Sequence, residues 1–260
     1  MSVLDLFRLD SRRALVTGGS RGLGRSMALA LADAGADVVI TGRTQSTLDA
    51  TADEIRARGR QSWTVVADMA VPETCEQVCA DMIRDIGPLD ILINNVGNRE
   101  GAQPIVEDTL DTWRRVMDLN LTSCAVATRL VGASMIEQGS GGRIINIASI
   151  SALIANRGIG GRGYETAKAA VLHFTRCAAV DWAPHGITVN AICPGLFMTD
   201  TNREWNERKP EVIEEFVKHI PMGRPGEPDE IGPLAVYLAS PASAYVTGSA
   251  YLIDGGYTAW

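Results

Sequence analysis

The sequence predicts a doubly wound α/β fold, in which helices cover both faces of a single seven-stranded parallel sheet. Short runs rich in β-branched residues alternate with longer segments of helical pattern along the whole chain of 260 residues, as in parallel α/β proteins. Several of the short runs are apolar almost throughout, which is typical of strands buried on both faces. No proline- or serine-rich linker divides the chain, so we expect one domain over residues 1–260.

Seven of the short runs are strand candidates. The seven candidates are RALVTGG (13–19), DVVITGR (37–43), SWTVVADM (62–69), LDILINNVG (89–97), GRIINIAS (142–149), GITVNAICPG (186–195) and SAYLIDGG (249–256). Between them, apolar residues recur with helical spacing at 24–34, 45–58, 73–86, 109–137, 163–183 and 228–239. The charged stretch 197–226 departs from this alternation. We expect it to form a lid over a binding site, and a solvated insertion is the alternative.

The composition excludes several classes of protein. With 46% hydrophobic and 21% charged residues, the chain is typical of globular proteins with a full core. The net charge of −7, without a basic cluster, argues against a nucleic-acid partner. The five cysteines lack the spacing of metal ligands, so we expect reduced thiols and no metal site. We find no signal-peptide pattern and no run of ~18 apolar residues, which predicts a cytoplasmic protein with no membrane partner.

The segment TGGSRGLG, residues 17–24, directly follows the first strand candidate. Gly18, Gly22 and Gly24 permit a tight turn and a close approach of the backbone to a ligand. The helix that follows offers free N–H groups and the positive end of its dipole to a phosphate. Between the first strand and the first helix of a βαβ unit, such a loop is a strong signal for a nucleotide-binding site.

The end of the second strand candidate indicates which dinucleotide this site prefers. An acidic residue there would bind both ribose hydroxyls of NAD, whereas this chain has Thr41 and Gly42 followed by Arg43. Arg21 in the glycine-rich loop can point toward the same place. Two guanidinium groups favour a 2′-phosphate, because charge-assisted bidentate contacts with phosphate are strong. We therefore predict NADP(H) as the cofactor; the alternative is that both arginines are solvated.

Tyr164 and Lys168 lie four residues apart in a helix candidate. At this spacing two side chains share one face of a helix, about 5–6 Å apart at Cβ. A cation held there favours the tyrosinate and lowers the phenol pKa from its free value of about 10. Tyr164 could then give or take a proton near neutral pH. A solvated surface pair is the alternative.

Through these and other motifs the chain resembles the short-chain dehydrogenase/reductase family over essentially its full length. The further matching elements are Asp68 after the third strand candidate, NNVG at 94–97, Asn120 in MDLNL, Ser149 after IINIA, and Pro194-Gly195 with Thr199 after the sixth. The resemblance implies a Rossmann fold and interconversion of an alcohol and a ketone on a small-molecule substrate. It also implies a homotetramer, with the helix candidates 109–137 and 163–183 forming a dimer interface.

The resemblance implies a role for each matched position. Tyr164 would be the general acid or base, with Lys168 lowering its pKa and binding the ribose. Ser149 would stabilise the reacting oxygen, and Asn120 would support a proton relay. The cofactor would contact Gly18, Ser20, Arg21, Gly22, Leu23, Gly24, Arg43, Asp68, Met69, Asn95, Val96, Gly97, Tyr164, Lys168, Ile192, Pro194, Gly195, Leu196 and Thr199.

Two departures from the family pattern bear on these roles. Val96 stands where alanine is usual, and we expect the larger side chain to be tolerated. The interval from Ser149 to Tyr164 is two residues longer than usual, whereas Ser151 has the usual interval. We assign the catalytic role to Ser149, at the end of the fifth strand candidate, and place two inserted residues within 156–163. Ser151 is the alternative.

The substrate is less constrained than the reaction. The motifs are closest to gluconate 5-dehydrogenase-like and 3-oxoacyl-carrier-protein reductase-like members. Arg99, Arg157 and Arg162 near the expected mouth suit a carboxylate or a phosphate, and they are equally compatible with a solvated rim. We predict a small polar substrate such as a sugar acid or a polyol; a 3-oxoacyl-carrier-protein reductase or a broad carbonyl reductase is the alternative. The intact catalytic set disfavours a nucleotide-binding protein without turnover.

Overall fold

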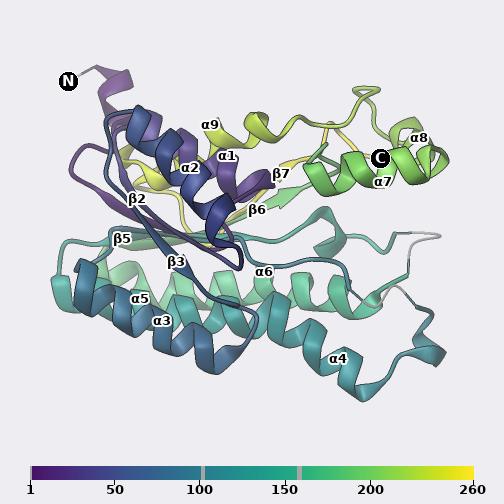
Figure 1. Ribbon diagram of the computed structural model, residues 1–260, viewed down its shortest axis with the longest axis horizontal. Helices are drawn as coiled ribbons and strands as arrows, with labels where there is room; N and C mark the ends of the chain where they lie inside the picture. The colour runs from purple at the N-terminus through teal and green to yellow at the C-terminus, as the bar shows by residue number, and fades with distance from the viewer. Residues whose placement is uncertain (1, 101–102, 157–159) are drawn as a thin grey trace.

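The computed structural model describes residues 2–100, 103–156 and 160–260 (Figure 1). Seven strands form one parallel sheet of order β3-β2-β1-β4-β5-β6-β7. They are β1 (Arg13–Val16), β2 (Asp37–Gly42), β3 (Ser62–Val66), β4 (Ile91–Asn94), β5 (Gly142–Ile147), β6 (Ile187–Pro194) and β7 (Ala250–Ile253). Each strand lies inside a predicted segment, and the predicted fold class is confirmed.

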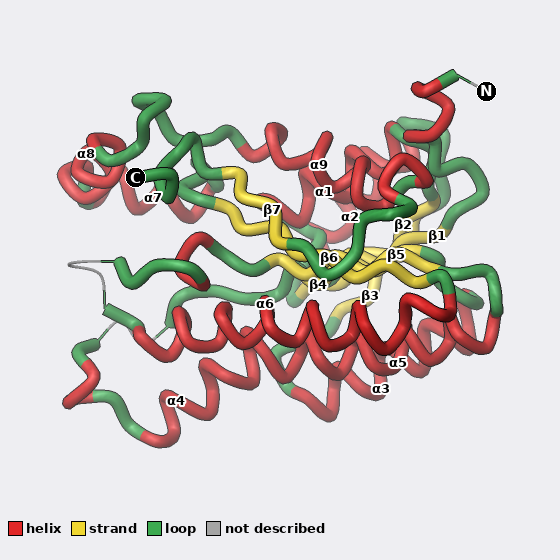
Figure 2. Tube along the Cα trace, turned by 180° about the vertical axis from the view of Figure 1, so that it is seen from behind, coloured by secondary structure: helices red, strands yellow, loops and turns green. Residues whose placement is uncertain are grey.

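Helices cover both faces of the sheet, as Figures 1 and 2 show from opposite sides. One layer contains α1 (Gly22–Asp33), α2 (Gln45–Ala57) and α9 (Gly232–Ala239). The other layer contains α3 (Pro72–Ile86), α4 (Leu110–Met117), α5 (Ser123–Gln138) and α6 (Arg162–Trp182). A parallel sheet needs crossovers of this kind, because each strand must return to the same edge before the next begins.

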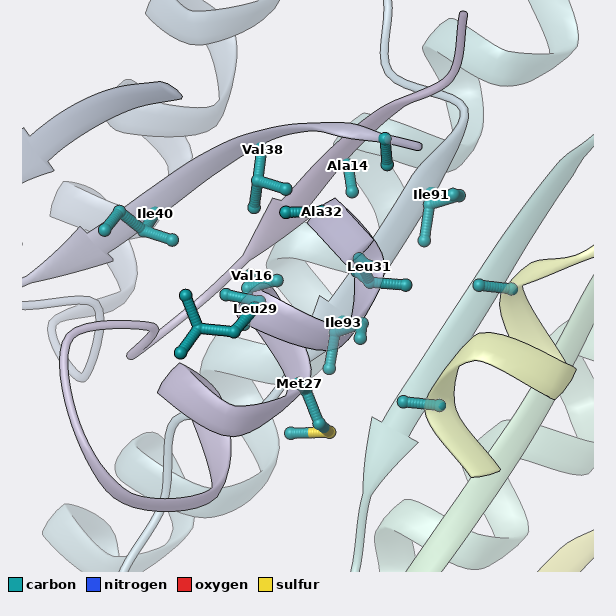
Figure 3. Close-up of a cluster of buried hydrophobic side chains, with 14 of the residues drawn as sticks. Ala14, Val16, Met27, Leu29, Leu31, Ala32, Val38, Ile40, Ile91 and Ile93 are labelled. Atoms are coloured by element: carbon teal, nitrogen blue, oxygen red, sulfur yellow. The ribbon is translucent and has the colours of Figure 1, made fainter. Parts of the chain in front are cut away.

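Apolar side chains fix α1 onto the centre of the sheet (Figure 3). Met27 and Leu31 of α1 pack in one cluster with Val16, Ile40 and Ile93 of three neighbouring strands, and all five are fully buried. Burying side chains of this size stabilises the fold by roughly 1.5–3 kcal/mol each. The packing therefore holds the start of α1 rigidly beside the carboxyl ends of β1, β2 and β4.

The chain reverses its direction of travel across the sheet at β1. From β1 it proceeds outward through β2 to β3, and it then returns to place β4 on the other side of β1. In open parallel sheets, ligands bind beyond the carboxyl ends of the strands at such a reversal. The loops that follow β1, β4 and β5 are thus where a site is expected.

The predicted helix 109–137 forms, but it is not one regular helix. A π-helical turn, Asp118–Thr122, joins α4 to α5. Such turns re-aim side chains and often occur at functional sites. The run Leu110–Gln138 has the length and apolar composition of a membrane-spanning helix, yet half of an apolar 18-residue part of it is buried within the domain, as in a core helix. The turn places Asn120 in the interior, where it is 1% exposed.

The charged stretch 197–226 contains two short helices, α7 (Asp200–Arg208) and α8 (Pro210–Lys218). The Thr199 side chain begins α7 by accepting a hydrogen bond from the Asn202 N–H. On α8, the Phe216 ring stacks on Tyr257, with ring centres 4.6 Å apart. Tyr257 therefore packs against its own chain, whereas Trp260 is exposed. A lid over the site stays a prediction for this segment.

Candidate active site

A cleft of about 1120 Å³ lies beyond the carboxyl ends of the central strands. It collects residues from motifs that lie far apart in the sequence, from Gly18 in the glycine-rich loop to Thr201 in the 197–226 segment. Of the predicted site residues, the cleft is lined by Gly18, Ser20, Arg21, Gly22, Leu23, Gly24, Arg43, Asp68, Met69, Asn95, Val96, Gly97, Ser149, Tyr164, Lys168, Pro194, Gly195 and Thr199.

Three predicted residues do not line the cleft: Asn120, Ile192 and Leu196. Ile192 is fully buried in β6, and the Leu196 carbonyl accepts a hydrogen bond from the Gly226 N–H at 2.9 Å. Further lining residues were not among the predicted site residues: Thr41, Gly42, Thr44, Thr47, Ala67, Ala70, Val71, Pro72, Glu73, Asn98, Glu100, Arg115, Asp118, Leu119, Ile147, Ala148, Asp200 and Thr201. Most flank a motif by one to four positions, so extending each motif along the chain would have found them. Arg115 had no such signal.

The glycine-rich loop is held against the end of β4 by one amide side chain. Asn95 Nδ2 donates hydrogen bonds to the carbonyls of Thr17 and Gly18, each at 3.1 Å. A Cβ atom at Gly24 would lie 2.2 Å from the Gly18 carbonyl oxygen, so only glycine fits where the loop crosses the first turn of α1. The N–H groups at the start of α1 thus face the cleft as a cradle for phosphate.

Two arginines stand beside this cradle. Arg21 and Arg43 both line the cleft and are exposed. Within the part of the chain that the structure describes, neither guanidinium forms an ion pair or a side-chain hydrogen bond. Thr44 and Thr47 add two hydroxyl groups to the same wall. The residues present therefore fit a phosphorylated ribose, because the described structure gives the two guanidinium groups no partner and places no carboxylate at the end of β2.

Buried amide and hydroxyl side chains form hydrogen bonds that join β4 and β5 to α5 and α6. Asn94 Nδ2 donates to Thr128 Oγ1 of α5 and to Asn146 Oδ1 of β5, both at 2.8 Å. Asn146 Nδ2 donates in turn to Thr175 Oγ1 of α6, at 2.9 Å. These bonds connect β4 and β5 to α5 and α6, and α6 carries Tyr164. The relative position of the catalytic candidates is thus set by the core.

Lys168 is almost fully buried and is oriented by the end of β5. Its side chain is 3% exposed, and its Nζ donates a hydrogen bond to the carbonyl oxygen of Ile147 at 2.8 Å. Burial lowers the pKa of Lys168 to about 8, because the ammonium loses its hydration. Lys168 therefore gains or loses its proton at a pH close to neutral.

Asn120 and Lys168 meet at Gly97. A Cβ atom at Gly97 would lie 2.6 Å from Asn120 Oδ1 and 2.8 Å from Lys168 Nζ. Asn120 Nδ2 donates to the carbonyls of Val116 and Asn98, each at 3.0 Å. Its Oδ1 has no hydrogen-bond partner among the described residues. The amide is thus held in one orientation, with its acceptor atom facing the same small space as the Lys168 ammonium.

The pKa of the Tyr164 phenol differs from the value that the sequence predicts. Burial raises its pKa above the ordinary value of 10.0; the Ser149 side chain and the Arg99 charge act in the opposite direction without outweighing burial. Lys168 Nζ lies 5.8 Å from the centre of the ring and donates its hydrogen bond to Ile147. The prediction that Lys168 brings the pKa of this phenol below 10 is therefore wrong for the chain itself, because desolvation of the phenol dominates.

Ser149 and Ser151 have different environments. Ser149 lines the cleft, and its Oγ accepts a hydrogen bond from the Ser151 N–H at 3.1 Å. Its own hydroxyl proton can therefore point toward a ligand. Ser151 Oγ instead accepts from Arg99 Nη2 at 2.9 Å and from Asn156 Nδ2 at 2.8 Å, away from the cleft wall.

The three arginines predicted near the mouth differ in their surroundings. Arg99 donates to Ser151 and to the Gly160 carbonyl, and Arg162 pairs with buried Glu165 at 2.6 Å. Arg157 lies outside the described residues, as do the other two residues of 157–159 within the predicted insertion. The charges that do line the cleft near Asn98 are Glu100 and Arg115, an ion pair at 3.2 Å.

The chain is similar to known proteins over almost its whole length. A family model described as enoyl-(acyl carrier protein) reductase matches residues 18–258. The galactitol 2-dehydrogenase (L-tagatose-forming) of Cereibacter sphaeroides is 37% identical over 260 residues, 100% of both chains. The gluconate 5-dehydrogenase of Gluconobacter oxydans is 38% identical over 258 residues, 99% of both. The crystal structure of a Burkholderia cenocepacia gluconate 5-dehydrogenase in complex with NADP and tartrate superposes with a TM-score of 0.92, at 35% identity over 100% of both chains.

These matches extend over almost the whole chain, and they agree with the order of the strands and with the cleft at the reversal of the sheet. The chain therefore belongs to the short-chain dehydrogenase/reductase family, whose members are oxidoreductases that bind nicotinamide cofactors.

Proposed function

We propose that the protein is an NADP(H)-dependent oxidoreductase that interconverts a secondary alcohol and a ketone on a small polar substrate, such as a sugar acid or a polyol. One observation carries the proposal: Tyr164, Lys168 and Ser149 line the same cleft as the glycine-rich loop. The polar rim formed by Glu100 and Arg115 supports a hydroxylated substrate. The names of the relatives, a galactitol and a gluconate dehydrogenase, support the same class.

The nicotinamide, when bound, supplies or accepts the hydride, and the protein manages the proton. Tyr164 gives its phenol proton to the oxygen of a ketone, or takes the proton of an alcohol. Because burial raises the pKa of this phenol above 10.0, Tyr164 holds its proton at neutral pH, which suits ketone reduction. Ser149 donates a hydrogen bond to the reacting oxygen and stabilises the negative charge that develops there.

Lys168 and Asn120 return the proton that Tyr164 gives away. Burial lowers the pKa of Lys168 to about 8, so the ammonium releases a proton readily near neutral pH. The free acceptor atom of Asn120 faces the same space at Gly97 and suits a water-mediated relay from there to solvent. Lys168 also binds the nicotinamide ribose in this proposal.

The cofactor preference rests on Arg43 with Arg21. Replacing Arg43 by leucine removes one guanidinium from the 2′-phosphate, and hydrogen bonds between charged groups contribute about 1.5–3 kcal/mol. We expect Arg43→Leu to raise KM for NADP⁺ by roughly 10- to 100-fold and to change KM for NAD⁺ by less than about threefold. Steady-state kinetics with both cofactors measures this.

Arg56→Leu is the matched control, since Arg56 is an exposed residue of α2 paired with Asp53. It should leave both KM values unchanged. An Arg43→Leu variant that keeps its KM for NADP⁺, or a native protein that strongly prefers NADH, would show that these arginines are solvated residues without a role in binding.

The two serines give a second prediction. Removing one donor from the reacting oxygen typically costs about 10²–10³ in turnover, and we expect this loss for Ser149→Ala. Ser151→Ala should lower turnover by less than about tenfold, because Ser151 does not line the cleft and Arg99 keeps its hydrogen bond to the Gly160 carbonyl. The measurement is kcat for the two variants under identical conditions. Full activity in Ser149→Ala would show that Ser149 does not stabilise the reacting oxygen.

The substrate class is tested by a screen followed at the nicotinamide absorbance band. Polyols and sugar acids are offered with NADP⁺ and NAD⁺, and the corresponding ketones and a 3-oxoacyl thioester with NADPH. We expect turnover with at least one polyol or sugar acid. Turnover confined to the thioester would favour a 3-oxoacyl reductase, and turnover confined to apolar ketones would favour a carbonyl reductase.

A cytoplasmic location and a homotetramer stay predictions. Exposed apolar residues on α4 and α6, among them Trp113 and Val180, support an interface on that layer. Leu252 of the edge strand β7 and the C-terminal Trp260 are also exposed and support a second interface. Light scattering gives the assembly directly, and a monomer at all concentrations would exclude both.

A further inference from the structure

Arg99 lies on the face of the Tyr164 ring and outside the cleft. Its Cζ is 4.7 Å from the ring centre, whereas Lys168 Nζ is 5.8 Å from it. A guanidinium within about 6 Å of a ring face is attracted to it, by about 0.5–2 kcal/mol. The ring is therefore flanked by two cations, and the nearer one belongs to no motif in the sequence.

The Arg99 guanidinium is fixed by hydrogen bonds to two other segments. Nη1 donates to the Gly160 carbonyl at 2.7 Å, and Nη2 donates to Ser151 Oγ at 2.9 Å. The Ser151 N–H in turn binds Ser149 Oγ at 3.1 Å. One planar side chain thus connects the loop after β4, the turn after β5 and the segment before α6. Ser149 lies at that turn, and Tyr164 lies in the first turn of α6.

The titratable groups around the phenol come from α6, from β6 and, with Arg99, from the loop after β4. Glu165 of α6 is buried and lies 3.6 Å from Arg99, but Arg162 pairs with it more closely, at 2.6 Å. Lys168 lies one helical turn away on α6. Cys193 of β6 is a neutral thiol, because burial raises its pKa to about 11. Two guanidinium groups therefore face one carboxylate, and the cluster retains positive charge beside the ring.

We propose that Arg99 is a positioning residue for Tyr164: its guanidinium, held between Ser151 and Gly160, fixes the ring and favours the deprotonated phenol. The inference rests on the proposed function, in which Tyr164 moves the proton. In this arrangement Ser151 anchors Arg99, and Gly160, in the segment before α6, supplies the second anchor. The direction of the Arg99 effect agrees with its lowering of the Tyr164 pKa against burial.

The test measures the phenol itself and needs no substrate. Replacing the tyrosines by 3,5-difluorotyrosine makes their phenols more acidic, so that they titrate where the protein stays folded. The fluorine resonance of Tyr164 is assigned by its loss in Tyr164→Phe. We expect Arg99→Met to raise the titration midpoint of this resonance by about one pH unit, the order expected for one charge at this distance in a partly solvated protein. Arg99→Lys should recover part of the shift, because it keeps the charge and loses the planar fork.

Arg84→Met is the control, since Arg84 is an exposed residue of α3 paired with Asp81 and Asp85. It should leave the midpoint unchanged. A midpoint in Arg99→Met equal to that of the native protein would overturn the proposal, and so would an equal shift in Arg84→Met. The two proposals fail in different ways. Activity in Tyr164→Phe would contradict the proposed function, whereas an unchanged titration midpoint in Arg99→Met would contradict only the role of Arg99.

Discussion

Tyr164→Phe lowers turnover by about 10²–10⁴-fold in the expected result, which is the range of general acid–base catalysis. The variant keeps the ring that packs under Arg99 and loses only the hydroxyl group. Cofactor affinity should therefore change little, because the glycine-rich loop, Arg21 and Arg43 are untouched. The measurements are kcat in both directions and the dissociation constant for NADP⁺, obtained from protein fluorescence.

A matched control is Tyr245→Phe, because Tyr245 is fully exposed and loses the same atom. Its turnover should equal that of the native protein. If Tyr164→Phe turns over at a near-native rate, the phenol is not the proton donor. If its affinity for NADP⁺ collapses as well, the loss of turnover reports a damaged cleft and the acid–base assignment loses its support.

Lys168→Met is expected to produce a protein that is inactive and more stable at neutral pH. Burial lowers the pKa of Lys168 from 10.5 to about 8. Below pH 8 the folded protein holds a charge out of water that the unfolded chain keeps hydrated, and a shift of this size corresponds to about 3 kcal/mol. The uncapped carbonyl of Ile147 offsets about 1 kcal/mol of the gain.

The gain in stability depends on pH in a defined direction. The folded protein binds fewer protons than the unfolded chain between pH 8 and 10.5, so the cost of burying the charge falls as pH rises through this window. We expect the free energy of unfolding of Lys168→Met to exceed that of the native protein by about 1–3 kcal/mol at pH 7 and by less at pH 9.5. Denaturant unfolding at the two pH values measures this difference. Turnover should fall by at least about 100-fold at both.

Lys218→Met is the control for this variant, because Lys218 is exposed and paired with Glu215 on the same helix. Surface pairs of this kind contribute less than about 1 kcal/mol, so stability should change little at either pH. A destabilised Lys168→Met at pH 7, or a gain that grows between pH 7 and 9.5, would contradict the cost assigned to the buried ammonium.

The sequence was sufficient for the parts of the molecule that local patterns determine. Apolar β-branched runs identified all seven strands, and motifs at strand ends identified most of the cleft, because the carboxyl ends of parallel strands meet at one edge. The raised pKa of Tyr164 could not be predicted in the same way. Spacing along a helix gives the distance to a cation, but the loss of water on burial depends on segments from the rest of the chain.

The environment of Arg99 shows the same limit. In the sequence it is one of several arginines near a mouth, and nothing distinguishes it from Arg162. In the fold, Arg162 neutralises Glu165 while Arg99 covers the Tyr164 ring. The π-helical turn at 118–122 is a further example: the pattern of 109–137 reads as one helix, and only packing reveals the interruption that buries Asn120.

The buried bonds from Asn94 through Asn146 to Thr128 and Thr175 have a consequence for how the protein meets its ligands. These bonds form between side chains of the polypeptide itself, so the strands and helices that carry the reacting groups are aligned during folding. The entropy of that alignment is then lost before any ligand arrives, which leaves more of the association free energy for the reaction. Replacing Asn94 or Asn146 by a residue with a shorter side chain would therefore slow the reaction, because the strands and helices would be less firmly aligned, although neither amide contacts substrate or nucleotide.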